Sequence, residues 1–135
     1  MSGLKYYSYP GVGEWARDKY SYSQAVRIGD RIECSGQGGW DFQDGWTFPS
    51  DLKEEISKAF ASVDKNLRDA GGKGCSQVFR INSYHTNMTE EVVALMAENI
   101  RKWMPDHKPI WTAVGVANLV DPDMHVEIAV VAYDP

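Results

Sequence analysis

The chain has 135 residues, of which 43% are hydrophobic and 24% charged, the size and composition of one globular domain. Its net charge of -5 disfavours a surface for nucleic-acid phosphates, and no apolar run approaches the roughly 20 residues that span a bilayer. We therefore expect one domain over residues 1-135, with neither a nucleic-acid partner nor a membrane partner.

The N-terminal segment lacks the apolar stretch of a secretory signal, and Cys34 and Cys75 fit neither a metal spacing nor a disulfide framework. We expect a cytoplasmic protein with two free thiols. The three histidines show no metal-ligand spacing, so we expect no metal site. Aromatic residues make up 12% of the chain, which indicates that some line a pocket or a subunit interface.

The first predicted element is a β-hairpin over 22–36, because apolar residues alternate on both sides of Gly29-Asp30, a pair suited to a tight turn. A loop rich in glycine and aromatic residues follows over 37–50. Its aromatic side chains could cover a cleft as a lid or fold onto the core, and the sequence leaves both alternatives open. These side chains are Trp40, Trp46 and Phe48.

Two amphipathic helices are predicted next. Ser50 is a suitable N-cap for the first, over 51–70, and Gly71-Gly72 ends it. Thr89 caps the second helix, and Pro105 stops it. The buried stripes are Leu52, Ile56, Ala59, Phe60, Val63 and Leu67 on the first helix and Val92, Met96, Ile100 and Trp103 on the second.

Three further strands are predicted near 76–86, 110–118 and 124–133. The order strand, strand, helix, strand, helix, strand, strand indicates an α+β fold, in which two helices cover one face of a mixed sheet of four to six strands. The last two strands are apolar on both sides, so the other sheet face would remain in water in a monomer. A patch of that size usually marks an assembly interface, and we expect a homo-oligomer.

Four stretches in this order resemble the Rid family, also called YjgF-like or endoribonuclease L-PSP proteins, and the resemblance spans about 20–133. They are YSQAV, IECSGQGG, KAFASVDKNLRDAGG and PIWTAVGVANLVDPDMHVEIAVVA. The resemblance implies a chorismate-mutase-like fold and a homotrimer whose sheets form a central barrel, with clefts between subunits. The best-known members hydrolyse reactive enamines and imines to ketones and ammonia without a cofactor, so none is expected.

The resemblance also implies positions for the cleft. The family's tyrosine falls on Tyr22, its serine on Ser35 with Gly36 beside it, and its late glutamate on Glu127. Glu127 interrupts an otherwise apolar strand, where a carboxylate is costly unless it is paired. We interpret it as an acid or base, the alternative being a structural salt bridge with a residue such as Arg80 or with a neighbouring subunit.

Trp111 stands where the resemblance implies the arginine that binds the substrate carboxylate, and Ala113 replaces a thiol-bearing residue. Arginine offers a planar fork of donors, whereas indole offers one N–H and no charge. An amino-acid-derived imine would lose a charge-assisted pair worth roughly 2 kcal/mol. Trp111 instead favours a neutral or aromatic ligand, although Arg80 could return a cation from another strand.

We expect a cofactor-free enzyme acting on a small imine, enamine or related carbonyl or enol compound, with Glu127 and Tyr22 as catalytic residues. The expected substrate-binding residues are Ser35, Gly36, Trp111, Arg80 and His85. Tyr22 could equally pack at an interface, and Cys34 could be either a buried hydrophobe or a reactive thiol. The alternative function is a trimer that binds metabolites without turnover. Ribonuclease activity is disfavoured because the sequence shows no basic patch with stacking aromatics.

Overall fold

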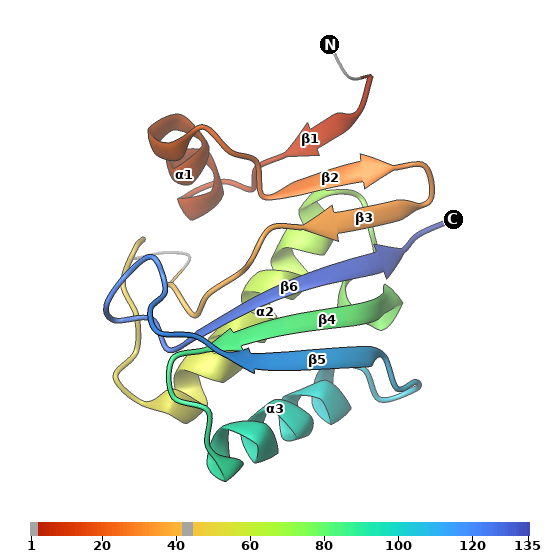
Figure 1. Ribbon diagram of the computed structural model, residues 1–135. Helices are drawn as coiled ribbons and strands as arrows, with labels where there is room; N and C mark the ends of the chain where they lie inside the picture. The colour runs from red at the N-terminus through yellow and green to blue at the C-terminus, as the bar shows by residue number, and fades with distance from the viewer. Residues whose placement is uncertain (1–2, 42–44) are drawn as a thin grey trace.

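The computed structural model describes residues 3–41 and 45–135, which form one six-stranded sheet with helices packed against it (Figure 1). The strands are β1 Lys5–Tyr7, β2 Ala25–Ile28, β3 Arg31–Cys34, β4 Val78–His85, β5 Ile110–Gly115 and β6 Val126–Tyr133, and the helices are α1 Val12–Tyr20, α2 Leu52–Asp69, α3 Glu90–Trp103 and the short 3-10 helix η1 Gly74–Gln77. The predicted α+β fold with a mixed sheet is confirmed. No helix in the described part of the chain is long and apolar enough to cross a membrane.

The sheet order is β1-β2-β3-β6-β4-β5, and only β4 and β5 run parallel. The predicted hairpin is confirmed as the β2–β3 pair, whose turn uses Gly29 at φ +61°. β5 and β6 follow each other in the chain, but β4 lies between them in the sheet. β5 and β6 therefore do not pair with each other, and they pair with opposite edges of β4.

The predicted helices α2 and α3 are confirmed, with one correction at a cap. Asp51 caps α2 and not Ser50, because the Asp51 carboxylate accepts a hydrogen bond from the Glu54 N–H at 3.1 Å, three residues along the chain. Thr89 caps α3 in the same way through the Val92 N–H. In Figure 1 both helices lie on one side of the sheet, where their apolar stripes meet the core.

Strand β1 and helix α1 were not predicted from the sequence. Helix α1 begins after Gly11, whose φ is +83°, and no side chain caps it. Its buried residues Val12 and Ala16 pack inward, and Gly13 lies so close to Tyr9 that a Cβ there would be 3.1 Å from the ring. Tertiary packing therefore holds this short helix, which lies beside β1 and β2, apart from α3 (Figure 1).

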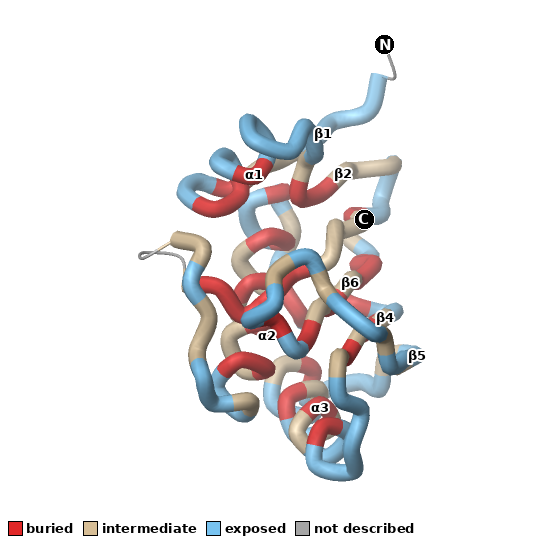
Figure 2. Tube along the Cα trace, turned by 60° about the vertical axis from the view of Figure 1, so that its left-hand side comes forward, coloured by how far each residue is buried: buried red, intermediate tan, exposed pale blue. Residues whose placement is uncertain are grey.

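Buried residues gather where helices α2 and α3 pack against the sheet (Figure 2), and the two faces of the sheet differ in burial. On β6, alternate residues face the helices and are buried, namely Val126, Ile128 and Val130. The residues between them, Glu127 and Ala129 among them, face the side that none of the described helices covers, which we call the open face. Its other members, by register, include Tyr6, Val26, Glu33, Arg80, Tyr84, Ile110 and Val114.

A second hydrophobic cluster joins α1 to the loop over 37–50. Trp40 is buried and stacks on Trp46 with 5.0 Å between ring centroids, and Trp46 contacts Trp15 at 5.3 Å and Phe48 at 5.2 Å. Of the two alternatives for these loop aromatics, the structure supports packing onto the core. Residues 42–44 of the same loop lie outside the described residues.

Candidate functional site

Glu127 is a carboxylate on the open face. It lies half-buried on β6, opposite Tyr84 of β4, so the two side chains are neighbours on the same face. Within the described chain Glu127 forms no hydrogen bond and no ion pair, and burial raises the pKa of its carboxyl above 4.5. An unpaired, partly desolvated carboxylate can exchange protons with a bound ligand or water.

The loop after β3 is built around the Glu127 carboxylate. A Cβ added to Gly36 would lie only 2.1 Å from Glu127 Oε2, so glycine is required for the close approach. The next residue, Gln37, exchanges two backbone hydrogen bonds with Ile128, at 2.7 and 2.9 Å. The structure therefore brings Gly36, and with it the neighbouring Ser35, to Glu127.

A buried network of polar side chains holds the loop after β3 in place. Gln37 Nε2 donates to Gln24 Oε1 at 2.8 Å, the Tyr9 hydroxyl donates to Gln37 Oε1 at 2.8 Å, and Trp40 Nε1 donates to the Tyr9 hydroxyl at 2.9 Å. Burial raises the pKa of Tyr9 far above its ordinary value, so its hydroxyl remains protonated and donates. Because the side-chain amide oxygen and nitrogen of Gln37 both form hydrogen bonds, they hold the loop in one conformation.

Ser35 and Cys34 have more restricted roles than the sequence allowed. The Ser35 hydroxyl donates to the Ser23 carbonyl at 2.7 Å, and its N–H donates to the Gln24 carbonyl at 2.8 Å. In this arrangement the Ser35 Oγ is available to a ligand only as an acceptor. Partial burial raises the pKa of the half-buried Cys34 thiol to about 12, so it remains protonated near neutral pH.

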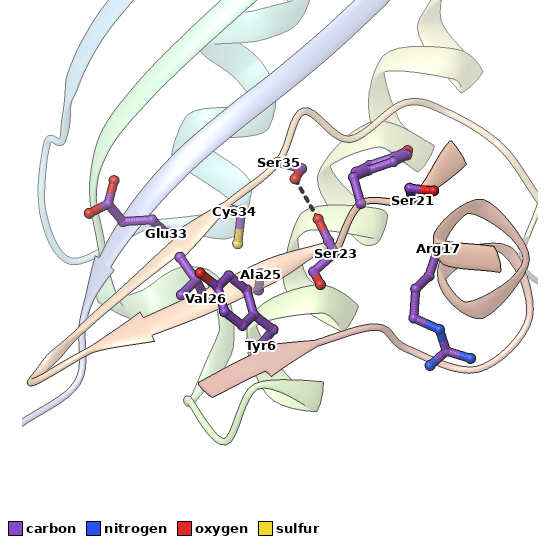
Figure 3. Close-up of a pocket in the computed structure, with 10 residues that line it drawn as sticks. Tyr6, Arg17, Ser21, Ser23, Ala25, Val26, Glu33, Cys34 and Ser35 are labelled. Carbon is purple, nitrogen blue, oxygen red and sulfur yellow. Dashed lines mark hydrogen bonds between the residues drawn. The ribbon is translucent and has the colours of Figure 1, made fainter. Parts of the chain in front are cut away.

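A cavity of about 700 Å³ lies next to Ser35, over β1, β2 and β3 and beside α1 (Figure 3). Tyr22 and Ser35 both line it, which places two of the predicted residues at one hollow. Tyr6, Val26 and Glu33 also line it, and their register puts them on the open face, the face of Glu127. Glu127 itself lies against Gly36, the residue after Ser35, beyond the cavity wall.

Trp111 and His85 lie on the opposite, helix-covered face. Trp111 pairs with Ile81 on β4 and packs against the core, where its Nε1 donates to Ser83 Oγ at 2.9 Å. Ser83 Oγ in turn lies 2.8 Å from Nε2 of His85, which is 1% exposed. Within one protomer these two residues therefore lie on the other face of the sheet from Glu127. Burial lowers the pKa of His85 and keeps its ring neutral.

Arg80 lies on the open face but at its far end. It pairs with Val131, whereas Glu127 pairs with Tyr84, four residues further along β4, which corresponds to roughly 13 Å. Arg80 borders a separate hollow of about 130 Å³ with Glu33. The salt bridge between Arg80 and Glu127, considered as the structural alternative, is not formed.

Two residues of this region were missed from the sequence. Tyr84 faces Glu127, but this follows only from the register of β4 against β6. Arg17 lines the cavity from α1, a helix whose short, glycine-containing segment carries little periodic signal. In the described chain no group of three His, Cys, Asp or Glu side chains is placed to hold a metal ion.

Comparison with known proteins identifies several relatives. The sequence profile described as Endoribonuclease L-PSP matches residues 16–134. The RutC family protein YjgH of Escherichia coli is 32% identical over 112 residues, which cover 82% of each chain. The 2-iminobutanoate/2-iminopropanoate deaminase of Dermatophagoides farinae is 26% identical over 98 residues, 73% of this chain and 74% of that protein.

The solved structures show the same fold. The structure of protein YJGH has a TM-score of 0.80 and 27% identity, with coverage of 96% of this chain and 95% of that one. RidA from an Antarctic Psychrobacter bacterium has a TM-score of 0.76 and 27% identity, with coverage of 85% and 89%. The similarity therefore extends over nearly the whole sheet and its helices.

Proposed function

The chain belongs to the endoribonuclease L-PSP family, and we propose that it hydrolyses a small imine or enamine to the carbonyl compound and ammonia without a cofactor. The observation that carries the proposal is Glu127, a half-buried carboxylate without a partner among the described residues, held against Gly36. The similarity to a deaminase of 2-imino acids supports the reaction class.

In the proposed reaction the Glu127 carboxylate removes a proton from water as the water oxygen adds to the imine carbon. The C=N electron pair moves to nitrogen, which takes a proton from solvent, and a carbinolamine forms. Glu127 then returns its proton to the nitrogen, the C–N bond breaks as the hydroxyl loses its proton to solvent, and ketone and ammonia leave. The raised pKa of Glu127 supports both roles, since proton transfer is most efficient when the pKa approaches the working pH.

No covalent intermediate is proposed. The Cys34 thiol is protonated near neutral pH, and the Ser35 hydroxyl already donates to a backbone carbonyl. Ser35 Oγ would accept a hydrogen bond from the substrate N–H, and Tyr22 would pack beside it at the rim of the same cavity. A trimer that only binds metabolites is the second candidate, because neither residue is an activated nucleophile.

We also propose the homotrimer. The open face exposes Tyr6, Ile110, Val114 and Tyr133, each at least 40% exposed, and an uncovered apolar sheet face favours assembly. Light scattering of the purified protein would return three times the mass of the 15.2 kDa chain. A mass equal to one chain at micromolar concentration would contradict this assembly.

The test of the reaction is ammonia release from an imine generated in the assay by an amino-acid oxidase. We expect Glu127→Gln to lower kcat by about 100-fold or more, because a general acid or base typically accelerates a reaction by 10²- to 10⁴-fold. Glu98→Gln, an exposed site on α3, is the matched control and should retain full activity. Binding of the carbonyl product without any turnover by the wild-type protein would favour the metabolite-binding trimer instead.

A further inference from the structure

Tyr9 connects two parts of the molecule that are distant in the sequence, the segment before α1 and the loop after β3. It is fully buried, and its hydroxyl donates to Gln37 Oε1 at 2.8 Å while it accepts a hydrogen bond from Trp40 Nε1 at 2.9 Å. Both partners belong to the loop that approaches Glu127. One hydroxyl therefore ties two points of that loop to the N-terminal part of the chain.

Gln37 transmits this restraint to the carboxylate. Its backbone exchanges two hydrogen bonds with Ile128, the residue after Glu127, at 2.7 and 2.9 Å. The residue before Gln37 is Gly36, which lies so close to the Glu127 carboxylate that a Cβ there would clash with it. Glu127 thus packs against backbone that Gln37 fixes, so a shift of the Gln37 side chain would move the surface on which the carboxylate rests.

The Tyr9 hydroxyl has no ready substitute in this network. Tyr9, Gln24 and Gln37 are each 0% exposed, so bulk water does not reach the bonds between them. The amide nitrogen of Gln37 donates to Gln24 Oε1 at 2.8 Å, so the amide cannot turn toward another donor without losing that bond. Removing the hydroxyl would leave a buried acceptor unpaired, and the loop would have to shift to satisfy it.

We propose that Tyr9 is a positioning residue for the reaction: through Gln37 it holds the loop after β3 against Glu127 and so sets the place of the carboxylate relative to the substrate. The inference rests on the proposed function, in which Glu127 moves the protons. Placement matters because a displacement of about 1 Å can lower a rate by roughly 100-fold. Tyr9 lies before residues 16–134, which match the family profile, so the family match assigns it no role.

The test compares ammonia release by the wild-type protein, Tyr9→Phe and Gln37→Met. Both variants remove the hydrogen bond between the two residues, from opposite ends and with little change in side-chain size, so each serves as the test if the other fails to fold. We expect each to lower kcat by about 10-fold or more with KM within about twofold of the wild type. Because both act through one bond, the double variant should lose no more than Gln37→Met alone.

Val63→Ala is the control for lost stability. Val63 is buried in the main core on α2, outside the network, so its truncation lowers stability without touching the loop and should leave kcat unchanged. Tyr20→Phe is the matched control for the loss of a tyrosine hydroxyl. Tyr20 is exposed at the end of α1, and its variant should also retain full activity.

A measurement without turnover separates this inference from the proposed reaction. Carbon-13 NMR of the glutamate carboxyl groups gives the pKa of Glu127, whose signal is identified by its loss in Glu127→Gln. We expect Tyr9→Phe to lower that pKa toward 4.5, because the loosened loop admits water to a carboxyl whose pKa burial has raised. Tyr20→Phe should leave it unchanged.

The outcomes distinguish the two proposals. A lowered pKa of Glu127 in Tyr9→Phe, in a protein that releases no ammonia, would refute only the proposed reaction. A kcat and a Glu127 pKa that both remain unchanged in Tyr9→Phe would overturn only the positioning role. A loss of kcat in Val63→Ala equal to the loss in Tyr9→Phe would also overturn it, because lowered stability would then explain both.

Discussion

Glu127 and His85 lie on opposite faces of the β4–β6 pair, and their environments are opposite. His85 faces the helices, is 1% exposed and is bonded to Ser83, whereas Glu127 faces the open side, half-buried and without a partner among the described residues. Burial shifts the pKa of both toward the neutral form. A perturbed pKa alone therefore does not mark a site, and access to a ligand separates the two residues.

The largest expected effect follows from the close contact between Gly36 and Glu127. Gly36→Ala would place a methyl group 2.1 Å from the carboxylate oxygen, so the carboxylate must move, and we expect ammonia release to fall by about 100-fold, as when an acid–base group is lost. Gly115→Ala on β5 is the control, because a Cβ there meets nothing closer than 3.6 Å. Equal activity in the two variants would show that the position of Glu127 is not critical.

On the helix-covered face we expect stability to change and catalysis to persist. Trp111→Ala removes half-buried packing and should lower the free energy of unfolding by about 2 kcal/mol. Trp111→Phe removes the hydrogen bond to Ser83 and should lower the free energy of unfolding by about 1 kcal/mol. Urea unfolding measures both. In each variant kcat should remain within about twofold of the wild type. A loss in kcat/KM without a loss of stability would place the indole against the substrate, as the sequence suggested.

His85 and Glu127, one on each face, should also make the free energy of unfolding depend on pH in opposite directions. The pKa of His85 is lowered below 6.5, so the unfolded chain binds more protons there, and stability falls as the pH drops below that value. The pKa of Glu127 is raised above 4.5, so its contribution to stability is lost as the pH rises from 4.5 through its folded pKa. Unfolding measured across pH 4 to 8 should show a flatter acid limb for His85→Gln and higher stability near pH 7 for Glu127→Gln.

The smallest expected effect concerns the cap of α2. Asp51→Ala removes the bond to the Glu54 N–H and should cost about 1 kcal/mol of stability, whereas Ser50→Ala should cost under about 0.3 kcal/mol. Thermal unfolding of the two variants separates them. Equal losses would indicate that Ser50 shares the cap, as the sequence first predicted.

The parts of the molecule that could be predicted depend on local patterns. The stripe of α2, the Gly29-Asp30 turn and the isolated Glu127 are visible in short windows of sequence. The face of Trp111 could not be predicted, because β5 carries apolar residues on both sides and its register to β4 is a long-range property. Arg17 was missed for a related reason, since tertiary contacts and not local propensity hold α1.

Trp15 of α1 contacts Trp46 of the second hydrophobic cluster at 5.3 Å between ring centroids, and Trp46 stacks on Trp40 at 5.0 Å. Indoles this close couple their electronic transitions, so the protein should give a strong near-ultraviolet dichroic signal that depends on their mutual angle. Trp15 lies two residues before Arg17 on the same helix. Any ligand that moves α1 would therefore change this optical signal, so the indole cluster is a built-in spectroscopic probe of that helix.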